Sequence, residues 1–386
     1  MTHVAITGVG LHPFGRFDSA STTDLGVVAV RRALAEAGVG RGEFQAAFCG
    51  TAYGGVATGH KILSRLGLTG QGIPILDVEA GCASGSAALM LAAASIRNGQ
   101  YDTVLVFGVD KMPKGLIRSS FFEPWQEEAG LAATPSFFAL RAQRLALSSG
   151  VTKDHLARVA VKNRRHGVHN EDAMFRKETS VDEVLGSRVV CEPLHLFMLC
   201  SPNEGAAALV LRREEVATTD SSLQPPVRLA AAVLRSHVPG SVLSESTPLS
   251  GLVDDDDVPP PTTLAANAAY EDSGLGPNDL DVVECQDTDA ARELQSCEEL
   301  GLCPAGGSAD FLDSGANDLG GRLPVNASGG LLSKGEPLGA SALGQVVDLI
   351  RQLRNECGPR QVDGARSALA HTVGRGANAG VVILTR

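Results

Sequence analysis

Cys82 is the residue whose type and position most directly suggest chemistry in this 386-residue chain. It follows an apolar, strand-like run, IPILDVEA, and precedes a small-residue stretch, ASGSAALMLAAASI, that is typical of a buried helix. The start of a helix carries partial positive charge and unpaired N–H groups, so a cysteine there favours its nucleophilic thiolate form. The alternative is a buried, unreactive thiol, the usual state of a free cysteine.

Alternating apolar runs and amphipathic stretches predict the elements that would position this thiol. VAITGVG and DTVLVFGVD are typical of buried strands, and LGVVAVRRALAEAGV is typical of a helix that ends at a glycine. Together they predict an α/β fold in which helices cover both faces of a sheet. A strand, a small-residue turn, a long helix and a closing strand occur twice, which indicates two similar halves, 1–225 and 226–386.

The alternation lapses over residues 111–150. This stretch holds the sole tryptophan, Trp125, and several phenylalanines. We interpret it as an inserted loop-and-helix region of the kind that shapes a substrate cavity or a subunit contact. A plain packing excursion is the open alternative.

Composition argues against several functional classes. The net charge of −11 disfavours a nucleic-acid surface. No apolar run approaches the roughly 20 residues of a membrane span, and the start, MTHVAITGVG, does not resemble a signal peptide. The eight cysteines are scattered, with no CxxC pair and no zinc-type spacing. We therefore expect a cytoplasmic protein with reduced thiols, no metal site and no membrane span.

Several segments in order along the chain carry a family resemblance. They are EAGCASGSAAL, VKNRRHGVHNEDAMF, NEGAAALVL, DVVECQDTD, NASGGLLSKGEPLG and AHTVGRGANAG. With them the chain resembles the thiolase superfamily, in the branch of sterol-carrier-protein-type thiolases and bacterial lipid-transfer acyl-CoA proteins. The resemblance implies two βαβαβαββ halves stacked in a five-layered αβαβα core and a homodimer. It also implies coenzyme A and acyl-CoA as substrates, with no covalently bound cofactor.

The family's catalytic residues transfer only in part. Its acyl-carrying cysteine corresponds to Cys82. Most relatives carry a His-Asp-Cys-Phe block where this chain has Gln286 followed by Asp-Thr-Asp, and a Gly-His-Pro block whose histidine is here Glu336. One nucleophile is therefore kept, while the histidine and cysteine that usually serve it are replaced.

The replacements change the proton chemistry that the site can perform. Glu336 could protonate a leaving carbanion, or take a proton from Cys82 or from a substrate carbon. Gln286 could orient a water or a thioester carbonyl but cannot exchange protons. The alternatives are a helix N-terminal carboxylate for Glu336 and a packed amide for Gln286.

Two glycine-rich turns are the remaining candidate contacts. His371 precedes the last glycine loop; if this loop folds over Cys82, its N–H groups could stabilise a thioester oxyanion. His371 is either a catalytic residue or, as we favour, a core histidine. The turn around Asn326 brings in Glu336, and Asn326 itself is more simply a turn former. The residues expected to contact the acyl-CoA are Gly374, Gly376, Ser328 and Gly329.

Other residues receive only default interpretations. Cys200 and Cys285 lie in apolar strand sequence and are predicted to be packing residues. Arg164 and Arg165, with His166 after them, could meet the phosphates of a CoA ester, but a solvated basic face is the default.

Three functions compete. The leading one is a thiolase-like acyltransferase that makes or cleaves a C–C bond in a β-ketoacyl-CoA through an acyl-Cys82 enzyme. The second is a retro-aldolase of a β-hydroxyacyl-CoA of the steroid side-chain type, which is disfavoured because such relatives use tyrosines where this chain has Gln286 and Glu336. The third is a non-catalytic acyl-CoA- or lipid-binding subunit. The resemblance also implies a small OB-fold partner protein with a zinc ribbon.

Overall fold

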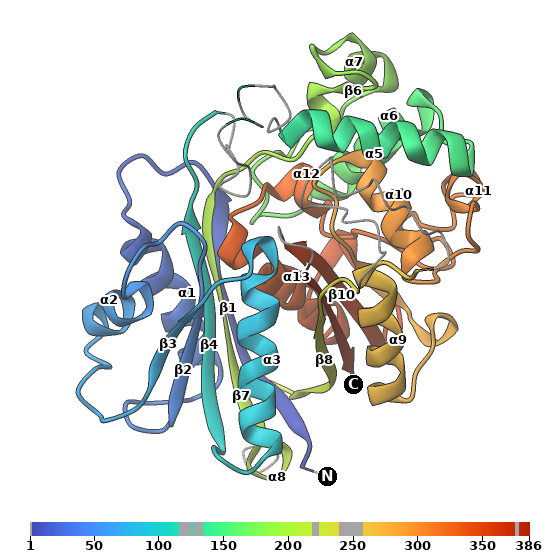
Figure 1. The fold of residues 1–386 in the computed structure, drawn as a ribbon. Coiled ribbons are helices and arrows are strands. Elements are labelled where there is room, and N and C mark those ends of the chain that lie inside the picture. Colours follow the sequence, from blue (N-terminus) through green and yellow to red (C-terminus); the bar gives the residue numbers. More distant parts are fainter. Residues whose placement is uncertain are drawn as a thin grey trace.

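The computed structural model describes residues 2–115, 125, 128, 134–217, 224–238, 258–374 and 378–386. Figure 1 shows the N-terminal half beside the C-terminal half, with a helical layer at the upper right, over the C-terminal half. Gly376, the acidic run 254–257 and much of the stretch around Trp125 lie outside the described residues. Within those residues no helix is long and apolar enough to cross a membrane.

The N-terminal half forms five strands in the order β3-β2-β4-β7-β1. The first three are mutually parallel, and β7 and β1 run antiparallel to their neighbours. The apolar side chains of β1, β2, β4 and β7 are buried on both faces, as the continuous apolar runs predict. The strands are β1 (Val4–Gly15), β2 (Ala46–Gly50), β3 (Ile75–Val78), β4 (Thr103–Lys111) and β7 (Glu204–Arg213).

The C-terminal half continues the same sheet in the order β8-β11-β10-β9. The two halves join where β1 pairs with β8 at only two positions, Ala5 with Arg228 and Ile6 with Val227. The sheet is therefore one nine-stranded sheet by hydrogen bonding, although each half has its own set of covering helices. The strands are β8 (Val227–Arg235), β9 (Val282–Glu284), β10 (Ser367–Gly374) and β11 (Asn378–Thr385).

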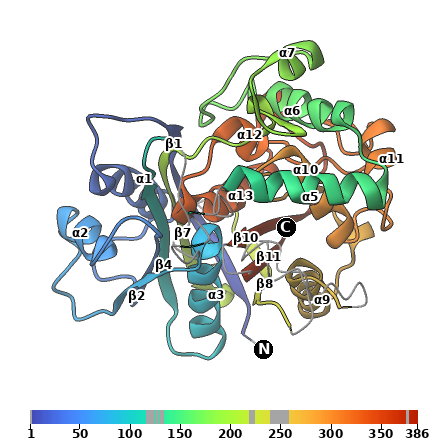
Figure 2. The ribbon, with the colours of Figure 1, turned by 45° about the horizontal axis from the view of Figure 1, so that its top comes forward.

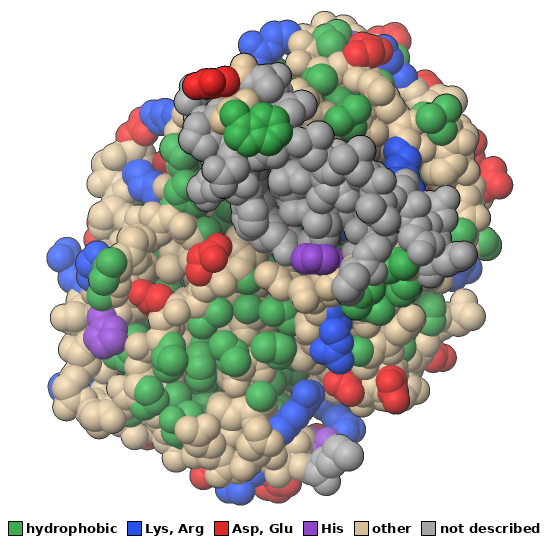
Figure 3. All heavy atoms as spheres, in the orientation of Figure 1, with side chains coloured by type: hydrophobic (Ala, Val, Ile, Leu, Met, Phe, Trp, Pro, Cys, Tyr) green, Lys and Arg blue, Asp and Glu red, His purple; other side chains and the backbone are tan. Residues whose placement is uncertain are grey.

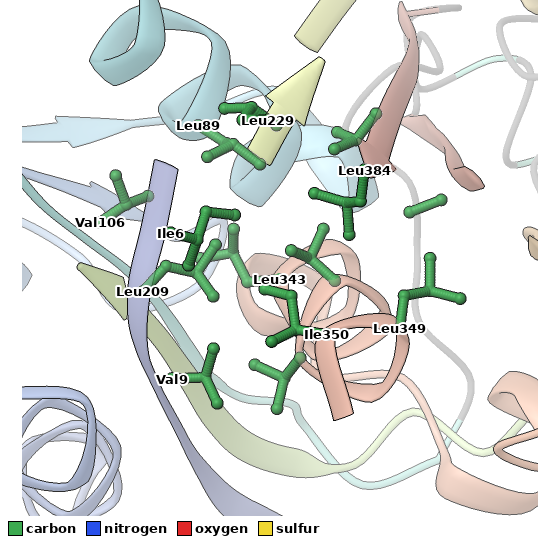
Figure 4. Packing of buried hydrophobic residues seen from close by; sticks show 14 of the residues in the cluster. Ile6, Val9, Leu89, Val106, Leu209, Leu229, Leu343, Leu349, Ile350 and Leu384 are labelled. Atoms are coloured by element: carbon green, nitrogen blue, oxygen red, sulfur yellow. The ribbon is translucent and has the colours of Figure 1, made fainter. Parts of the chain in front are cut away.

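Helices complete five layers, which confirms the predicted αβαβα thiolase fold. The outer layers are α1 (Thr22–Glu36) with α2 (Thr58–Arg65), and α9 (Pro261–Ser273) with α10 (Ala290–Glu299). The central layer is α3 (Ser84–Arg97) and α13 (Leu338–Leu353), and the side chains of both meet those of β1, β7, β8 and β11 in the main core (Figure 4). Small residues let these two helices approach closely: a Cβ on Gly85 would lie 3.1 Å from the carbonyl oxygen of Gly339.

The connection from β4 to β7 forms the helical layer. It carries α5 (Thr134–Ser149), α6 (Lys153–Gly167), α7 (Val181–Gly186) and a hairpin of β5 (Val189–Cys191) and β6 (Leu194–His195). Figure 2 shows α5 and α6 across the end of the molecule, beside α10 and α12 (Gly330–Lys334). The excursion thus extends well beyond the predicted 111–150, because α6 and the hairpin pack with α5 and not on the sheet. Two short helices complete the set: α11 (Ser308–Asp313) packs in the helical layer, and α8 (Glu214–Ala217) follows β7.

Candidate active site

The strand directions gather the candidate residues at one edge of the sheet. β2, β3 and β4 are parallel, so their carboxyl ends share this edge, and β7 begins there because Lys111 pairs with Glu204. In the other half, β9 and β10 are parallel and also end together. Loops that are more than a hundred residues apart in sequence therefore meet at the top of the two central helices.

Cys82 lies at the start of helix α3, as predicted. It belongs to a short 3₁₀ turn, Gly81–Ala83, and is 7% exposed. The Ser84 hydroxyl fixes this turn, because it donates to the carbonyl oxygen of Gly81 at 2.6 Å and accepts from the N–H of Ala80 at 2.9 Å. None of the eight cysteines forms a disulfide. The Cys82 thiol thus forms no disulfide and lies at the N-terminus of α3.

Glu336 lies two residues before α13, and neutral donors hold its carboxylate. Its Oε1 accepts from Nε2 of Gln286 at 2.8 Å, and its Oε2 accepts from the Cys200 thiol at 3.3 Å. Its backbone N–H donates to the carbonyl oxygen of Ser201, and its side chain is 4% exposed. Among the described residues no cation forms an ion pair with this carboxylate.

Cys200 is the functional-site residue that the sequence interpretation missed. The prediction of a packing residue is wrong, because its thiol faces Glu336 and lines the same cavity as Cys82. Burial, followed by the neighbouring Glu336 carboxylate, raises the pKa of the Cys200 thiol well above its usual value, which keeps it protonated as a donor. The signal that could have revealed Cys200 is the strand topology. Cys200 lies just before β7, which is antiparallel to β4, so it lies at the sheet edge where β2, β3 and β4 end.

A buried aspartate fixes the position of helix α13 relative to the first half. Asp110, near the end of β4, accepts hydrogen bonds from Thr51 Oγ1 at 2.8 Å, from the Tyr53 N–H at 2.9 Å and from the Gly339 N–H at 2.7 Å. Burial raises the pKa of the Asp110 carboxyl even though these donors oppose the shift. The clamp places Leu338 against Cys82.

The turn before Glu336 is held from beneath by two buried carboxyl groups. Asp287 accepts from the N–H groups of Leu331 at 2.6 Å and Leu332 at 3.2 Å, at the start of α12. Glu284 accepts from the N–H of Ser328 at 2.8 Å and from its hydroxyl at 2.6 Å. Burial raises the pKa of Glu284 to about 7.

The residues expected at the acyl-CoA in this turn therefore have structural contacts. Ser328 is committed to Glu284, and Gly329, at a φ of +96°, packs against Gly167 of α6. Neither lines the cavity that contains Cys82. Asn326 adopts a left-handed backbone conformation at φ +57°, and its side-chain Oδ1 accepts from the Cys285 N–H at 2.9 Å.

His371 lies in the core of the C-terminal half. It is fully buried on β10, where its Nε2 lies 3.1 Å from the Thr262 hydroxyl, and it does not line the cavity. Burial, followed by the charge of Arg292, lowers its pKa well below the usual value, so the ring is neutral. This placement matches the core-histidine interpretation.

Gly374 ends β10 directly against the Cys82 turn. A Cβ at this position would clash with the carbonyl oxygen of Ala80 and would lie 3.1 Å from the Cβ of Ala83. Only glycine allows this approach. The adjacent Val373 lines the cavity.

Gly374→Ala is expected to destabilise the fold by about 1–3 kcal/mol, because a methyl group forces apart two packed backbones. It is also expected to slow any reaction of Cys82 by about 100-fold, because small misplacements of a reacting group are costly. Thermal unfolding and acyl-adduct kinetics would measure both effects. Gly186→Ala is the matched control, since a Cβ there meets nothing within 4 Å. A Gly374→Ala variant indistinguishable from this control would contradict the close approach.

A cavity of about 930 Å³ connects these residues with the surface. Side chains from both halves line it, together with residues of α5, α6, the β5–β6 hairpin and the segment between α6 and α7. The lining residues nearest the candidate site in sequence or by contact are Cys82, Cys200, Thr288, Glu336, Leu338 and Val373.

A five-layered αβαβα fold with a cysteine at the start of a central helix, open to a deep cavity, defines a thiolase-type protein. The chain belongs to the thiolase family: the thiolase N-terminal domain matches residues 4–215, and the thiolase C-terminal domain-like family matches residues 254–386. This confirms the resemblance seen in the sequence. Members of the family are generally acyltransferases.

The relatives show the range of roles within the family. The chain is 36% identical to sterol carrier protein 2 of Bos taurus, over 99% of this chain and 71% of that one. It is 35% identical to the benzoylsuccinyl-CoA thiolase subunit BbsB of Thauera aromatica, over 97% and 96% of the two chains. It is 33% identical to an acetyl-CoA acetyltransferase of Methanothermobacter thermautotrophicus, over the full length of both.

Two solved structures share the fold. One, described as an Ltp2-ChsH2(DUF35) aldolase, has a TM-score of 0.85 at 24% identity, covering 99% of this chain and 97% of that one. The other, human mitochondrial 3-ketoacyl-CoA thiolase, has a TM-score of 0.74 at 16% identity, covering 100% and 99%. At these identities the likeness concerns the fold alone.

Proposed function

We propose that this protein transfers acyl groups between Cys82 and coenzyme A, and so makes or cleaves a C–C bond in a β-ketoacyl-CoA. The observation that carries the proposal is that one cavity is lined by both the Cys82 thiol and the Glu336 carboxylate, which forms no ion pair with the cations that the structure describes. The thiol supplies the nucleophile, and the carboxylate supplies a proton acceptor and donor.

In the cleavage direction, the Glu336 carboxylate takes the proton of Cys82, and the thiolate attacks the β-carbonyl carbon. The bond between the α- and β-carbons then breaks, and the released carbanion takes the proton back from Glu336. In the second half, Glu336 takes the proton of the CoA thiol, whose sulfur attacks the acyl-Cys82 thioester. The expelled Cys82 thiolate recovers that proton, so each half leaves the site as it began.

The neighbours of Glu336 support this cycle. Gln286 and Cys200 donate to the ionised carboxylate, which stabilises the form that accepts a proton. Backbone N–H groups at the Cys82 turn and near Gly374 are our proposal for the oxyanion contacts. Exposed cations that line the cavity, Arg176, Lys177 and Arg188, suit the phosphates of coenzyme A.

The direct experiment is to offer a panel of β-ketoacyl-CoA thioesters together with free CoA, and to follow loss of the β-ketoacyl group and formation of two shorter acyl-CoAs. CoA-dependent cleavage of at least one thioester is expected. A protein that binds these thioesters but cleaves none, alone or with a partner, would instead be an acyl-CoA-binding subunit.

A retro-aldolase of a β-hydroxyacyl-CoA is the second candidate. The carboxylate of Glu336 in the cavity is in keeping with it, because Glu336 could deprotonate a β-hydroxyl group without help from Cys82, although the tyrosines of such relatives are absent at positions 286 and 336. The same panel extended to β-hydroxyacyl-CoAs separates the two. Release of an aldehyde or ketone that survives Cys82→Ala would favour the aldolase.

A partner protein with an OB fold and a zinc ribbon is also proposed for this chain. The solved structure described as an Ltp2-ChsH2(DUF35) aldolase is in keeping with it. Co-purification of such a protein from the same genomic neighbourhood would test it.

We also propose a homodimer, formed through the outer edge of the N-terminal half. β3 is the last strand of the sheet, and Leu76 on it is 44% exposed. Leu91 on the neighbouring helix α3 is 40% exposed, and Figure 3 shows hydrophobic side chains grouped over this region. An unpaired strand is complementary to itself in antiparallel orientation, so a second copy of the chain satisfies a two-fold contact there.

Leu76→Lys is therefore expected to convert a dimer to a monomer, because it places a charge from each copy within the proposed apolar contact. Light scattering after size-exclusion chromatography measures the change. Leu147→Lys, at a 90% exposed position on α5, is the control and should leave the mass unchanged. A dimer that tolerates Leu76→Lys would place the interface elsewhere.

A further inference from the structure

Arg164, on the last turn of α6, differs from the other buried cations of the described chain. Lys162 pairs with Glu293 at 2.8 Å, Arg292 pairs with Glu299 at 2.6 Å, and Lys334 pairs with Asp348. Arg164 has neither a hydrogen bond nor an ion pair among the described residues, and it lines the cavity. Burial alone lowers its pKa to about 10, so the side chain still carries its charge at neutral pH.

Two aromatic rings hold this guanidinium in place. Its Cζ lies 4.0 Å from the ring centroid of Phe175 and 5.8 Å from that of Phe197, and both rings also line the cavity. Aromatic contacts immobilise the planar group without using its N–H donors. The donors are therefore ordered, partly desolvated and without an acceptor, which is the arrangement that binds a carboxylate through two parallel hydrogen bonds.

The backbone beside Arg164 is hydrogen-bonded to the segment that leads to Glu336. The neighbouring Asn163 accepts, through its carbonyl oxygen, a 2.9 Å hydrogen bond from the Ser333 hydroxyl, and Phe175 donates its N–H to the Ser333 carbonyl oxygen. Ser333 precedes Glu336 by three residues. Arg164 is also half-buried, whereas the cations assigned to the CoA phosphates, Arg176, Lys177 and Arg188, are exposed.

We infer that Arg164 binds a carboxylate carried by the acyl chain, so that the substrates are CoA thioesters of dicarboxylic acids. This inference rests on the proposed acyl-CoA substrate and specifies its class. The carboxylate at the far end of the acyl chain would meet Arg164, while the thioester carbonyl faces Cys82. An uncharged acyl chain of the same length would leave the guanidinium desolvated and unpaired, which disfavours its binding.

The test compares two thioesters of equal chain length, glutaryl-CoA and pentanoyl-CoA. Calorimetry with the full chain carrying Cys82→Ala measures binding without acyl transfer. Glutaryl-CoA is expected to bind about 10- to 100-fold more tightly than pentanoyl-CoA, as one charged hydrogen-bonded pair allows. Adding Arg164→Gln should remove this preference: it weakens the binding of glutaryl-CoA and does not weaken the binding of pentanoyl-CoA. Arg165→Gln, an exposed neighbour on the same helix, should change neither.

The outcomes separate the two possible anions and the two proposals. Equal weakening of both thioesters by Arg164→Gln would show that Arg164 meets a CoA phosphate, and would overturn the inference. Equal binding of both thioesters by the Cys82→Ala protein would also overturn it while leaving the proposed acyl-CoA chemistry intact. If Arg164→Gln fails to fold, the affinities of the Cys82→Ala protein for glutaryl-CoA and pentanoyl-CoA still test the inference. Binding of neither thioester would remove both proposals.

Discussion

Cys82→Ala is expected to abolish acyl transfer and the covalent adduct that precedes it. The wild-type protein, incubated with an acyl-CoA and examined by intact-mass spectrometry, should gain the mass of one acyl group per chain. The variant should gain none, because no other side chain at the start of α3 can form a thioester. Thiolysis should fall to the background rate, a loss of at least about 10⁴-fold for removal of a covalent nucleophile.

The other cysteines provide the controls. Cys200 lines the same cavity, but burial and Glu336 raise its pKa, so it is a poor nucleophile. Peptide mapping of the adduct should therefore place the acyl group on Cys82 alone. The small change in side-chain volume should leave the fold intact, which thermal unfolding checks. An adduct of equal yield on Cys82→Ala, or no adduct on the wild type, would exclude the acyl-enzyme.

The architecture was predictable because it depends on local patterns. Strands such as VAITGVG and DTVLVFGVD are buried on both faces, so their composition alone reveals them. The small residues that follow Cys82 reveal a helix that has to approach another backbone closely. The extent of the helical layer was not predictable, because α6 and the β5–β6 hairpin have ordinary composition and only their packing on α5 places them above the sheet.

A site residue was predictable only where its own residue type and its position in the sequence pattern indicated a chemical role. Cys82 and Glu336 stand at positions that the resemblance marks. From the sequence, Cys200 was interpreted as a packing residue, since its partner Glu336 is more than a hundred residues away. Arg164 was interpreted as a surface residue, since its proposed role depends on the lack of an acceptor among the described residues. Ser328 and Gly329 show the reverse case: a conspicuous glycine turn contacts Glu284 and Gly167, and acts on the site only by positioning Glu336.

Glu336→Gln is expected to lower the rate of acyl transfer by about 10²- to 10⁴-fold, the usual contribution of a positioned acid–base group. Gln is nearly identical in shape but cannot take a proton from Cys82 or from CoA. Its amide would also face two donors, Gln286 Nε2 and the Cys200 thiol, so at least one donor loses its acceptor. The loss should appear in the first turnover as well as in the steady state, because both halves of the cycle use this carboxylate.

Cys200→Ala separates proton transfer from simple packing. It keeps the carboxylate but removes one donor to its charged form, so protonation becomes easier. The acid limb of the pH–rate profile should therefore move to higher pH, while activity at alkaline pH falls less than about 10-fold. A packing role for Glu336 would give a different pattern, with both variants losing stability and the profile keeping its shape. An unshifted profile for Cys200→Ala, combined with full activity of Glu336→Gln, would assign the proton transfers to another group.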